Sequence, residues 1–161
     1  MKKILILANN DVGLYKFRKE LVLELLKDNE VYISLPYGGF VDLLIKMGCK
    51  FINTNIGRRS KNPFKDLFLL NTYKRIIKKI KPDVILTYTI KPNIYGAIAS
   101  KGKIPILANI TGLGSAVENP GLIQKITLFL YRIATPKMKV IFFQNQENLN
   151  FFIKHNLQIN N

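Results

Sequence analysis

Short apolar runs alternate with segments of helical periodicity along the whole chain. The runs occupy residues 3–8, 30–36, 50–56, 83–89, 104–110 and 140–145. Nearly continuous apolar runs of this kind are typical of parallel strands that are buried on both faces. The helical segments between them lie at 15–28, 39–48, 64–80, 93–102 and 122–136. The alternation predicts a single α/β domain, a Rossmann-like doubly wound parallel sheet of about six or seven strands with helices on both faces.

Two of the predicted helices carry a clear apolar stripe. In segment 15–28, Phe17, Leu21 and Leu25 recur one turn apart, as expected for the face that packs on a core. In segment 64–80 the stripe consists of Leu69, Leu70, Tyr73, Ile76, Ile77 and Ile80. Lysines cover the opposite side of this second helix.

Length, charge and cysteine content narrow the class of protein. The 161 residues are 48% hydrophobic, which is enough for one domain with a genuine core. The formal net charge of +15 indicates an anionic partner, such as phosphate groups, nucleic acid or an acidic membrane leaflet. Cys49 is the single cysteine, which excludes an internal disulfide and favours a reducing, cytoplasmic location. No run approaches the roughly 18 apolar residues of a membrane span, so we expect any membrane contact at the surface only.

The basic residues concentrate between Arg58 and Lys81, where Asp66 is the single acid. This segment has three interpretations: a solvated face of a core-packed helix, a surface for anionic lipid, or a nucleic-acid surface. In the lipid-binding interpretation, the apolar side chains near the helix start would insert into the lipid interface, namely Phe64, Leu67 and Phe68. No helix-turn-helix, zinc-finger or aromatic RNA-binding signature is present, so we expect no nucleic-acid partner.

Polar clusters follow four of the predicted strands, at 9–13, 88–93, 111–115 and 144–148. Because the carboxyl ends of parallel strands meet at one edge of the sheet, these clusters predict a single binding site. Each cluster alone is also compatible with an ordinary turn or helix cap. The stretch 111–115 matches neither a Walker loop nor a complete G-x-G-x-x-G fingerprint.

Residues with an obvious catalytic role are scarce. The single histidine, His155, has no matching nucleophile motif and is interpreted as a surface residue. No cluster has metal-ligand spacing, and we expect neither a metal nor a cofactor. Asp11 and Glu118 are the carboxylates on the predicted rim and the candidates for a general base toward a hydroxyl. The catalytic residue remains unassigned.

Four stretches, in this order and spacing, resemble the N-terminal half of family-4 glycosyltransferases with the GT-B fold. They are KKILILANNDVGLYKFRKELVLELL, YTIKPNIYGAIAS, ANITGLGSAVE and VIFFQNQENLNFF, and the similarity runs from Lys2 to about Leu157. Within that family the resemblance points to bacterial enzymes of capsule, O-antigen and lipid-linked oligosaccharide synthesis, including N-acetylhexosaminyltransferases. It implies an acceptor-binding domain for a polyprenyl-diphosphate-linked sugar or glycan at the cytoplasmic face of the membrane. The nucleotide-sugar donor would bind to a separate C-terminal domain.

The resemblance also implies a set of substrate-binding positions. Among them, Lys16 and Arg18 would meet acceptor phosphates, and the glycines would bring backbone close to the sugar. The full set is Asn9, Asn10, Gly13, Lys16, Arg18, Tyr88, Lys91, Thr111, Gly112, Gly114 and Asn145. Many family members have a glycine pair in the first loop and a histidine after the fourth strand. Here the sequences NNDVG and YTIKP stand instead, so no catalytic residue is carried over.

The domain organisation expected from the resemblance is half of a GT-B enzyme. Residues 1–157 form the Rossmann-like domain, residues 158–161 form a frayed tail, and the donor-binding glycines and paired-glutamate motif of a second domain are absent. We therefore expect a chain that is inactive alone, either a truncated half or a membrane-associated subunit of a split glycosyltransferase with a donor-domain partner. The alternative is a non-catalytic basic module for phosphate or nucleic acid. The expected location is peripheral, at the inner face of the plasma membrane.

Overall fold

A parallel sheet of six strands organises the described part of the chain. The computed structural model describes residues 1–57, 62–113 and 120–159. The strands are β1 (Lys2–Leu7), β2 (Asn29–Leu35), β3 (Lys50–Asn53), β4 (Val84–Tyr88), β5 (Ile106–Ile110) and β6 (Val140–Phe143). They pair in parallel in the order β3-β2-β1-β4-β5-β6. This arrangement confirms the predicted doubly wound, Rossmann-like sheet.

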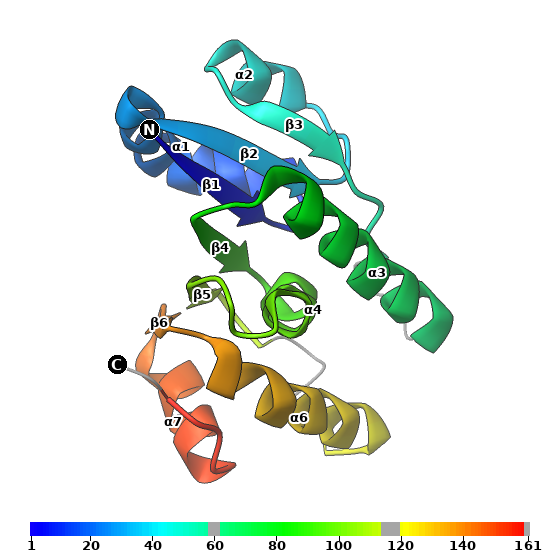
Figure 1. The fold of residues 1–161 in the computed structure, drawn as a ribbon. Helices are drawn as coiled ribbons and strands as arrows, with labels where there is room; N and C mark the ends of the chain where they lie inside the picture. The colour runs from blue at the N-terminus through cyan, green and yellow to red at the C-terminus, as the bar shows by residue number, and fades with distance from the viewer. Residues whose placement is uncertain (58–61, 114–119, 160–161) are drawn as a thin grey trace.

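Helices cover both faces of the sheet (Figure 1). Their bounds are α1 (Asp11–Asp28), α2 (Val41–Lys46), α3 (Pro63–Ile80), α4 (Ile90–Ser100), α6 (Leu122–Ala134), a 3₁₀ turn η1 (Thr135–Lys137) and α7 (Gln146–Lys154). Successive side chains of β1 enter different cores, because Leu5 and Leu7 pack toward α3, α4 and α6, whereas Ile4 and Ile6 pack toward α1 and α2. Burial on both faces explains why the strand sequences are continuous apolar runs.

The apolar stripe predicted for α1 is wrong at Phe17 and Leu21, whereas its third member, Leu25, is partly buried and packs against the core. Leu14 and Val22 are the apolar residues that α1 buries, whereas Phe17 is 67% exposed and Leu21 is 38% exposed. The row that contains Leu14 and Val22 and the row that contains Phe17 and Leu21 both repeat about once per turn, so periodicity does not distinguish them. Packing against the sheet determines that the row of Leu14 is buried. For α3 the prediction is confirmed, because Leu69, Tyr73, Ile76, Ile77 and Ile80 are buried and Leu70 packs against the same core.

A glycine lets α4 approach the sheet closely. A Cβ atom at Gly96 would lie 2.8 Å from Cδ1 of Leu7 and 3.1 Å from Cγ2 of Thr87. This close packing holds α4 against β1 and β4, the two strands between which the winding of the sheet reverses. The loops that follow β1 and β4 therefore diverge, and a crevice forms at the carboxyl ends of the strands. Within the described residues, no helix is long and apolar enough to cross a membrane.

Candidate binding cleft at the carboxyl ends of the strands

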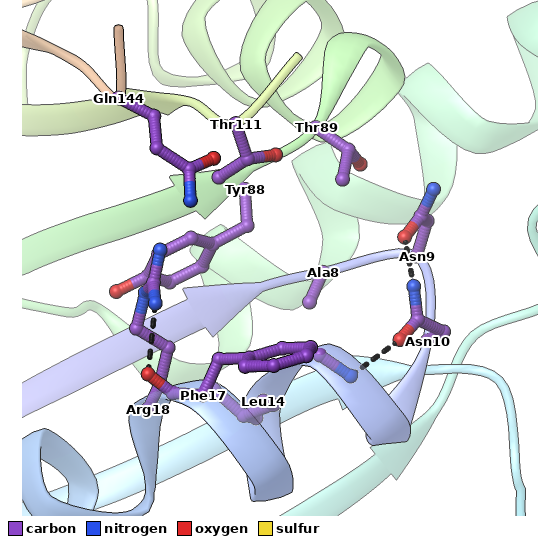
Figure 2. A pocket seen from close by; sticks show the side chains of 11 residues that line it. Ala8, Asn9, Asn10, Leu14, Phe17, Arg18, Tyr88, Thr89, Thr111 and Gln144 are labelled. Carbon is purple, nitrogen blue, oxygen red and sulfur yellow. Dashed lines mark hydrogen bonds between the residues drawn. The ribbon is translucent and has the colours of Figure 1, made fainter.

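A cavity of about 330 Å³ lies in this crevice, at the low end of the range for small-molecule sites. The ends of β1, β4, β5 and β6 and the first turns of α1 surround it (Figure 2). Its lining residues are Ala8, Asn9, Asn10, Gly13, Leu14, Phe17, Arg18, Tyr88, Thr89, Thr111 and Gln144. The four polar clusters that follow separate strands in the sequence thus contribute to one cavity.

Two asparagines form one end of the cavity. Asn10 caps α1, because its Oδ1 accepts a hydrogen bond of 2.7 Å from the backbone N–H of Gly13. Its Nδ2 donates to Oδ1 of Asn9 over 2.7 Å. A Cβ atom at Gly13 would lie 3.2 Å from Oδ1 of Asn10, so glycine keeps this side of the cavity open and the cap undisturbed. The two amides are therefore held in a fixed orientation by the start of the helix.

A cation and an aromatic ring form the other end. Cζ of Arg18 lies 5.6 Å from the ring centroid of Tyr88, and Nη1 donates to the carbonyl oxygen of Phe17 over 2.8 Å. Burial raises the pKa of the Tyr88 hydroxyl, and the neighbouring Arg18 guanidinium offsets part of that rise. Among the described residues that line the cavity, Arg18 is the only charged one. Its planar guanidinium matches the geometry of phosphate oxygens.

Thr89 combines an unusual backbone with an unpaired hydroxyl. Its φ of 74° and ψ of 164° lie in a region that β-branched residues rarely adopt, at a cost of about 1–3 kcal/mol. The residue joins β4 to α4, and its Oγ1 is buried without a hydrogen-bond partner. Strain of this kind persists where surrounding structure enforces it and concentrates at ligand sites. Thr89 is therefore a candidate ligand-contacting residue.

The structure distributes the predicted site residues between the cavity and its surroundings. Asn9, Asn10, Gly13, Arg18, Tyr88 and Thr111 line the cavity, although their role in binding remains a prediction. The described residues Lys16, Lys91, Gly112 and Asn145 are not among the lining residues. Gly114 lies outside the described residues, as do Glu118 and the basic residues Arg58, Arg59 and Lys61.

Three of the side chains outside the cavity have local contacts of their own. Nζ of Lys16 lies 5.4 Å from the ring centroid of Phe40. Nζ of Lys91 pairs with Oδ1 of Asp66 over 2.6 Å. Asn145 caps α7, because its Oδ1 accepts the N–H of Asn148 over 2.8 Å. Asp11, a candidate base, is 6% exposed, and its carboxylate accepts the backbone N–H groups of Val12 and Phe40.

Sequence reasoning missed Phe17 as a cavity residue because it assigned the side chain to the core. Its position one turn after Gly13 and next to Arg18 was the available signal. Thr89 and Gln144, which belong to two of the predicted polar clusters, also line the cavity. In the described part of the chain, no group of His, Cys, Asp and Glu side chains is arranged to hold a metal ion.

The fold defines the class of protein: a Rossmann-like domain of the kind that makes up half of a GT-B fold. More specifically, a family model described as "Glycosyl transferase 4-like" matches residues 3–145, and the chain belongs to this family.

Individual relatives agree with this assignment. The chain is 30% identical over 156 residues to the N,N'-diacetylbacillosaminyl-diphospho-undecaprenol alpha-1,3-N-acetylgalactosaminyltransferase of Campylobacter jejuni, an alignment that covers 90% of this chain and 40% of that protein. A glycosyltransferase from Rickettsia africae has a similar structure, with a TM-score of 0.72, 21% identity and coverage of 98% of this chain and 40% of the other.

The same fold occurs in enzymes with another activity. The UDP-GlcNAc 2-epimerase of Neisseria meningitidis has a TM-score of 0.65 at 14% identity, with coverage of 97% of this chain and 44% of the other. Fold similarity alone therefore does not separate sugar transfer from epimerisation. The chain spans about 40% of the length of the curated relative.

Proposed function

We propose that this chain is the acceptor-binding half of a glycosyltransferase that transfers a sugar from a nucleotide-sugar to a polyprenyl-diphosphate-linked sugar or glycan. The observation that carries the proposal is the cleft at the carboxyl ends of β1, β4, β5 and β6 in a chain of the glycosyl transferase 4-like family. The Campylobacter relative is named for a diphospho-undecaprenol acceptor. This name supports a lipid-linked acceptor for the present chain.

The chemistry of the cleft suits such an acceptor. The Arg18 guanidinium supplies a permanent positive charge and planar donors for a diphosphate. The amides of Asn9, Asn10 and Gln144 and the hydroxyls of Thr89 and Thr111 offer donors and acceptors for sugar hydroxyl groups. The donor would bind to a second Rossmann-like domain facing this cleft. Transfer requires both substrates to be held together, so the half-site orients the acceptor and does not complete the reaction alone.

Large apolar side chains are exposed at the start of α3 and along one side of α6. These side chains are Phe64, Leu67, Phe68, Leu122, Ile123, Ile126, Phe129 and Ile133. The starts of α3 and α6 project on the same side of the molecule, past the carboxyl ends of the strands (Figure 1). We call these eight residues the α3/α6 surface.

The occupant that fits the α3/α6 surface is an anionic bilayer. Segment 120–139 contains Lys125, Arg132, Lys137 and Lys139 and no Asp or Glu. Exposed apolar side chains next to basic ones are the pattern of helices that lie in a membrane interface. A lipid-linked acceptor is presented at such an interface, so docking of this surface would turn the carboxyl edge of the sheet, where the cleft lies, toward its substrate. The proposed location is therefore peripheral, at the inner face of the plasma membrane.

Binding and transfer assays test the acceptor-binding role separately. We expect the chain to bind a short-chain polyprenyl-diphosphate-N-acetylhexosamine at least about tenfold more tightly than UDP-N-acetylhexosamine, and Arg18→Gln to weaken that binding. Lys19→Gln, on the same helix but outside the cavity lining, is the matched control. Preference for the nucleotide-sugar would contradict the proposal.

Transfer is measured with a radiolabelled UDP-N-acetylhexosamine donor, using the chain alone and with lysate of a host that lacks its gene. Transfer only with lysate would establish a two-subunit enzyme. Transfer by the chain alone would overturn the half-enzyme role. A full-length relative that is active in the same assay provides the positive control. If that relative is active and neither the chain alone nor the chain with lysate transfers sugar, the chain is a binding half without a partner in that host.

A further inference from the structure

Phe17 is an exposed aromatic residue that does not contribute to the hydrophobic cores of the fold. The side chain of Phe17 is 67% exposed, whereas Leu14 and Val22 of the same helix are buried. Burial of a phenylalanine side chain contributes about 1.5–3 kcal/mol, and Phe17 forgoes most of that contribution. The ring instead lines the cavity. A large apolar surface left open inside a polar cleft is a candidate contact for a ligand.

The surroundings of Phe17 leave space above its ring. One turn earlier, Gly13 has no side chain, and the atom nearest to a Cβ there would be Oδ1 of Asn10, at 3.2 Å. Figure 2 shows the Phe17 ring on one side of the cavity and Thr89, Thr111 and Gln144 across from it. The cavity thus has one apolar wall and one wall of hydrogen-bonding groups.

The next residue supplies the charge. Arg18 Nη1 donates to the backbone carbonyl of Phe17 over 2.8 Å, which ties the guanidinium to the helix turn that carries the ring. Its contact with the Tyr88 ring restrains it from a second side. An aromatic platform and a phosphate-binding cation are therefore held next to each other on one turn of α1.

A pyranose matches this combination, because one face of the ring presents C–H groups while hydroxyls project from its edge. We propose that Phe17 is the platform on which the pyranose of a diphosphate-linked sugar stacks, while the adjacent Arg18 binds the diphosphate. This inference rests on the proposed function and deepens it, because it assigns the sugar and the diphosphate to neighbouring residues. A phenyl ring has no hydrogen-bond donor or acceptor, so Phe17 contributes affinity for the sugar without distinguishing its substituents. The amides and hydroxyls on the opposite wall of the cavity distinguish the substituents of the sugar.

The absence of tryptophan from the sequence permits a direct test. Phe17→Trp places a single indole at the proposed platform. Three probes are titrated: a short-chain polyprenyl-diphosphate-N-acetylhexosamine, the same polyprenyl diphosphate without sugar, and UDP-N-acetylhexosamine. We expect the sugar-bearing lipid to change the indole emission and the sugar-free lipid to change it several-fold less. The third probe distinguishes a lipid-linked from a nucleotide-linked source of the sugar diphosphate.

Affinities of side-chain variants provide the second readout, measured by calorimetry on the same chain. Phe17→Ala should weaken binding of the sugar-bearing lipid at least about tenfold and binding of the sugar-free lipid less than about threefold. Leu23→Ala, which removes another exposed apolar side chain of α1 outside the cavity, should change neither. Circular dichroism of each variant shows whether the fold is retained.

The outcomes separate this inference from the proposed function. Unchanged binding of the sugar-bearing lipid by Phe17→Ala would overturn the inference and leave the acceptor-binding role intact. Wild-type chain that binds none of the probes would overturn both. A response confined to the nucleotide-sugar would support stacking on Phe17 while contradicting the acceptor-binding role.

Discussion

The carboxylate of Asp11 accepts a hydrogen bond of 2.6 Å from the backbone N–H of Phe40, joining the first turn of α1 to the loop before α2. The contact is strengthened by a ring stack, since the centroids of Tyr15 and Phe40 are 5.0 Å apart. The first turns of α1 carry both Gly13 and Phe17. A contact that fixes this end of the helix therefore also fixes one wall of the cleft.

The two glycines of this loop should respond differently to substitution. A Cβ at Gly38 would lie 2.5 Å from both carboxylate oxygens of Asp11, whereas a Cβ at Gly39 would meet nothing within 4 Å. We expect Gly38→Ala to lower the free energy of unfolding by about 1–3 kcal/mol and Gly39→Ala to change it by less than about 0.5 kcal/mol. Urea denaturation measures both. Equal effects would contradict the close packing of Gly38 on Asp11.

The ion pair of Lys91 with Asp66 should contribute measurably to stability. The side chains are only 17% and 22% exposed, so solvent screens their attraction poorly. A double-mutant cycle with Lys91→Met and Asp66→Asn should give a coupling free energy of about 1–2 kcal/mol. The side chains of Lys27 and Glu24, which form another ion pair, are 64% and 69% exposed. The coupling free energy of this exposed pair should be less than about 0.5 kcal/mol. Similar coupling in the two pairs would show that burial is not the decisive difference.

Cys49 should make stability fall at high pH. Burial raises the pKa of its thiol from 9.0 to about 11. The folded state therefore keeps the proton longer than the unfolded state, and the resulting stabilisation is complete below pH 9 and is lost as the pH rises through about 11. The difference in unfolding free energy between wild type and Cys49→Ala should narrow over this window, by up to about 2–3 kcal/mol. A difference that stays constant would contradict a buried neutral thiol.

The α3/α6 surface should bind anionic vesicles in a salt-dependent way. Phe129→Ser removes an exposed apolar side chain of α6, and we expect it to weaken binding at least about fivefold. Lys125→Gln should weaken binding about fivefold at low salt and less at high salt, because each basic residue near the surface contributes about 1 kcal/mol. Phe142→Ser, at an exposed phenylalanine of β6, is the control. Sedimentation with vesicles measures all three, and equal loss in the control would argue against a specific surface.

Local pattern explains why some of the residues that line the cavity were predictable and why Lys91 was misplaced. Asn9, Asn10 and Thr111 come just after apolar strands and Tyr88 ends one, and parallel pairing brings such positions to one edge of the sheet. Lys91 occupies a similar position in the sequence. Its charge is nevertheless paired with Asp66, which is 25 residues away on α3. No local pattern encodes that pairing, because it depends on how α3 packs against α4.

The sequence by itself determined the alternation of strands and helices and the edge of the sheet at which the polar clusters gather, because two-sided burial requires continuous apolar strands separated by amphipathic helices. Only the tertiary structure decided the strand order that places β1 beside β4, and which side of α1 meets the core. These features depend on contacts between residues far apart along the chain. The exposed position of Phe17 follows from them, since packing of Leu14 and Val22 against the sheet turns that ring into the cleft.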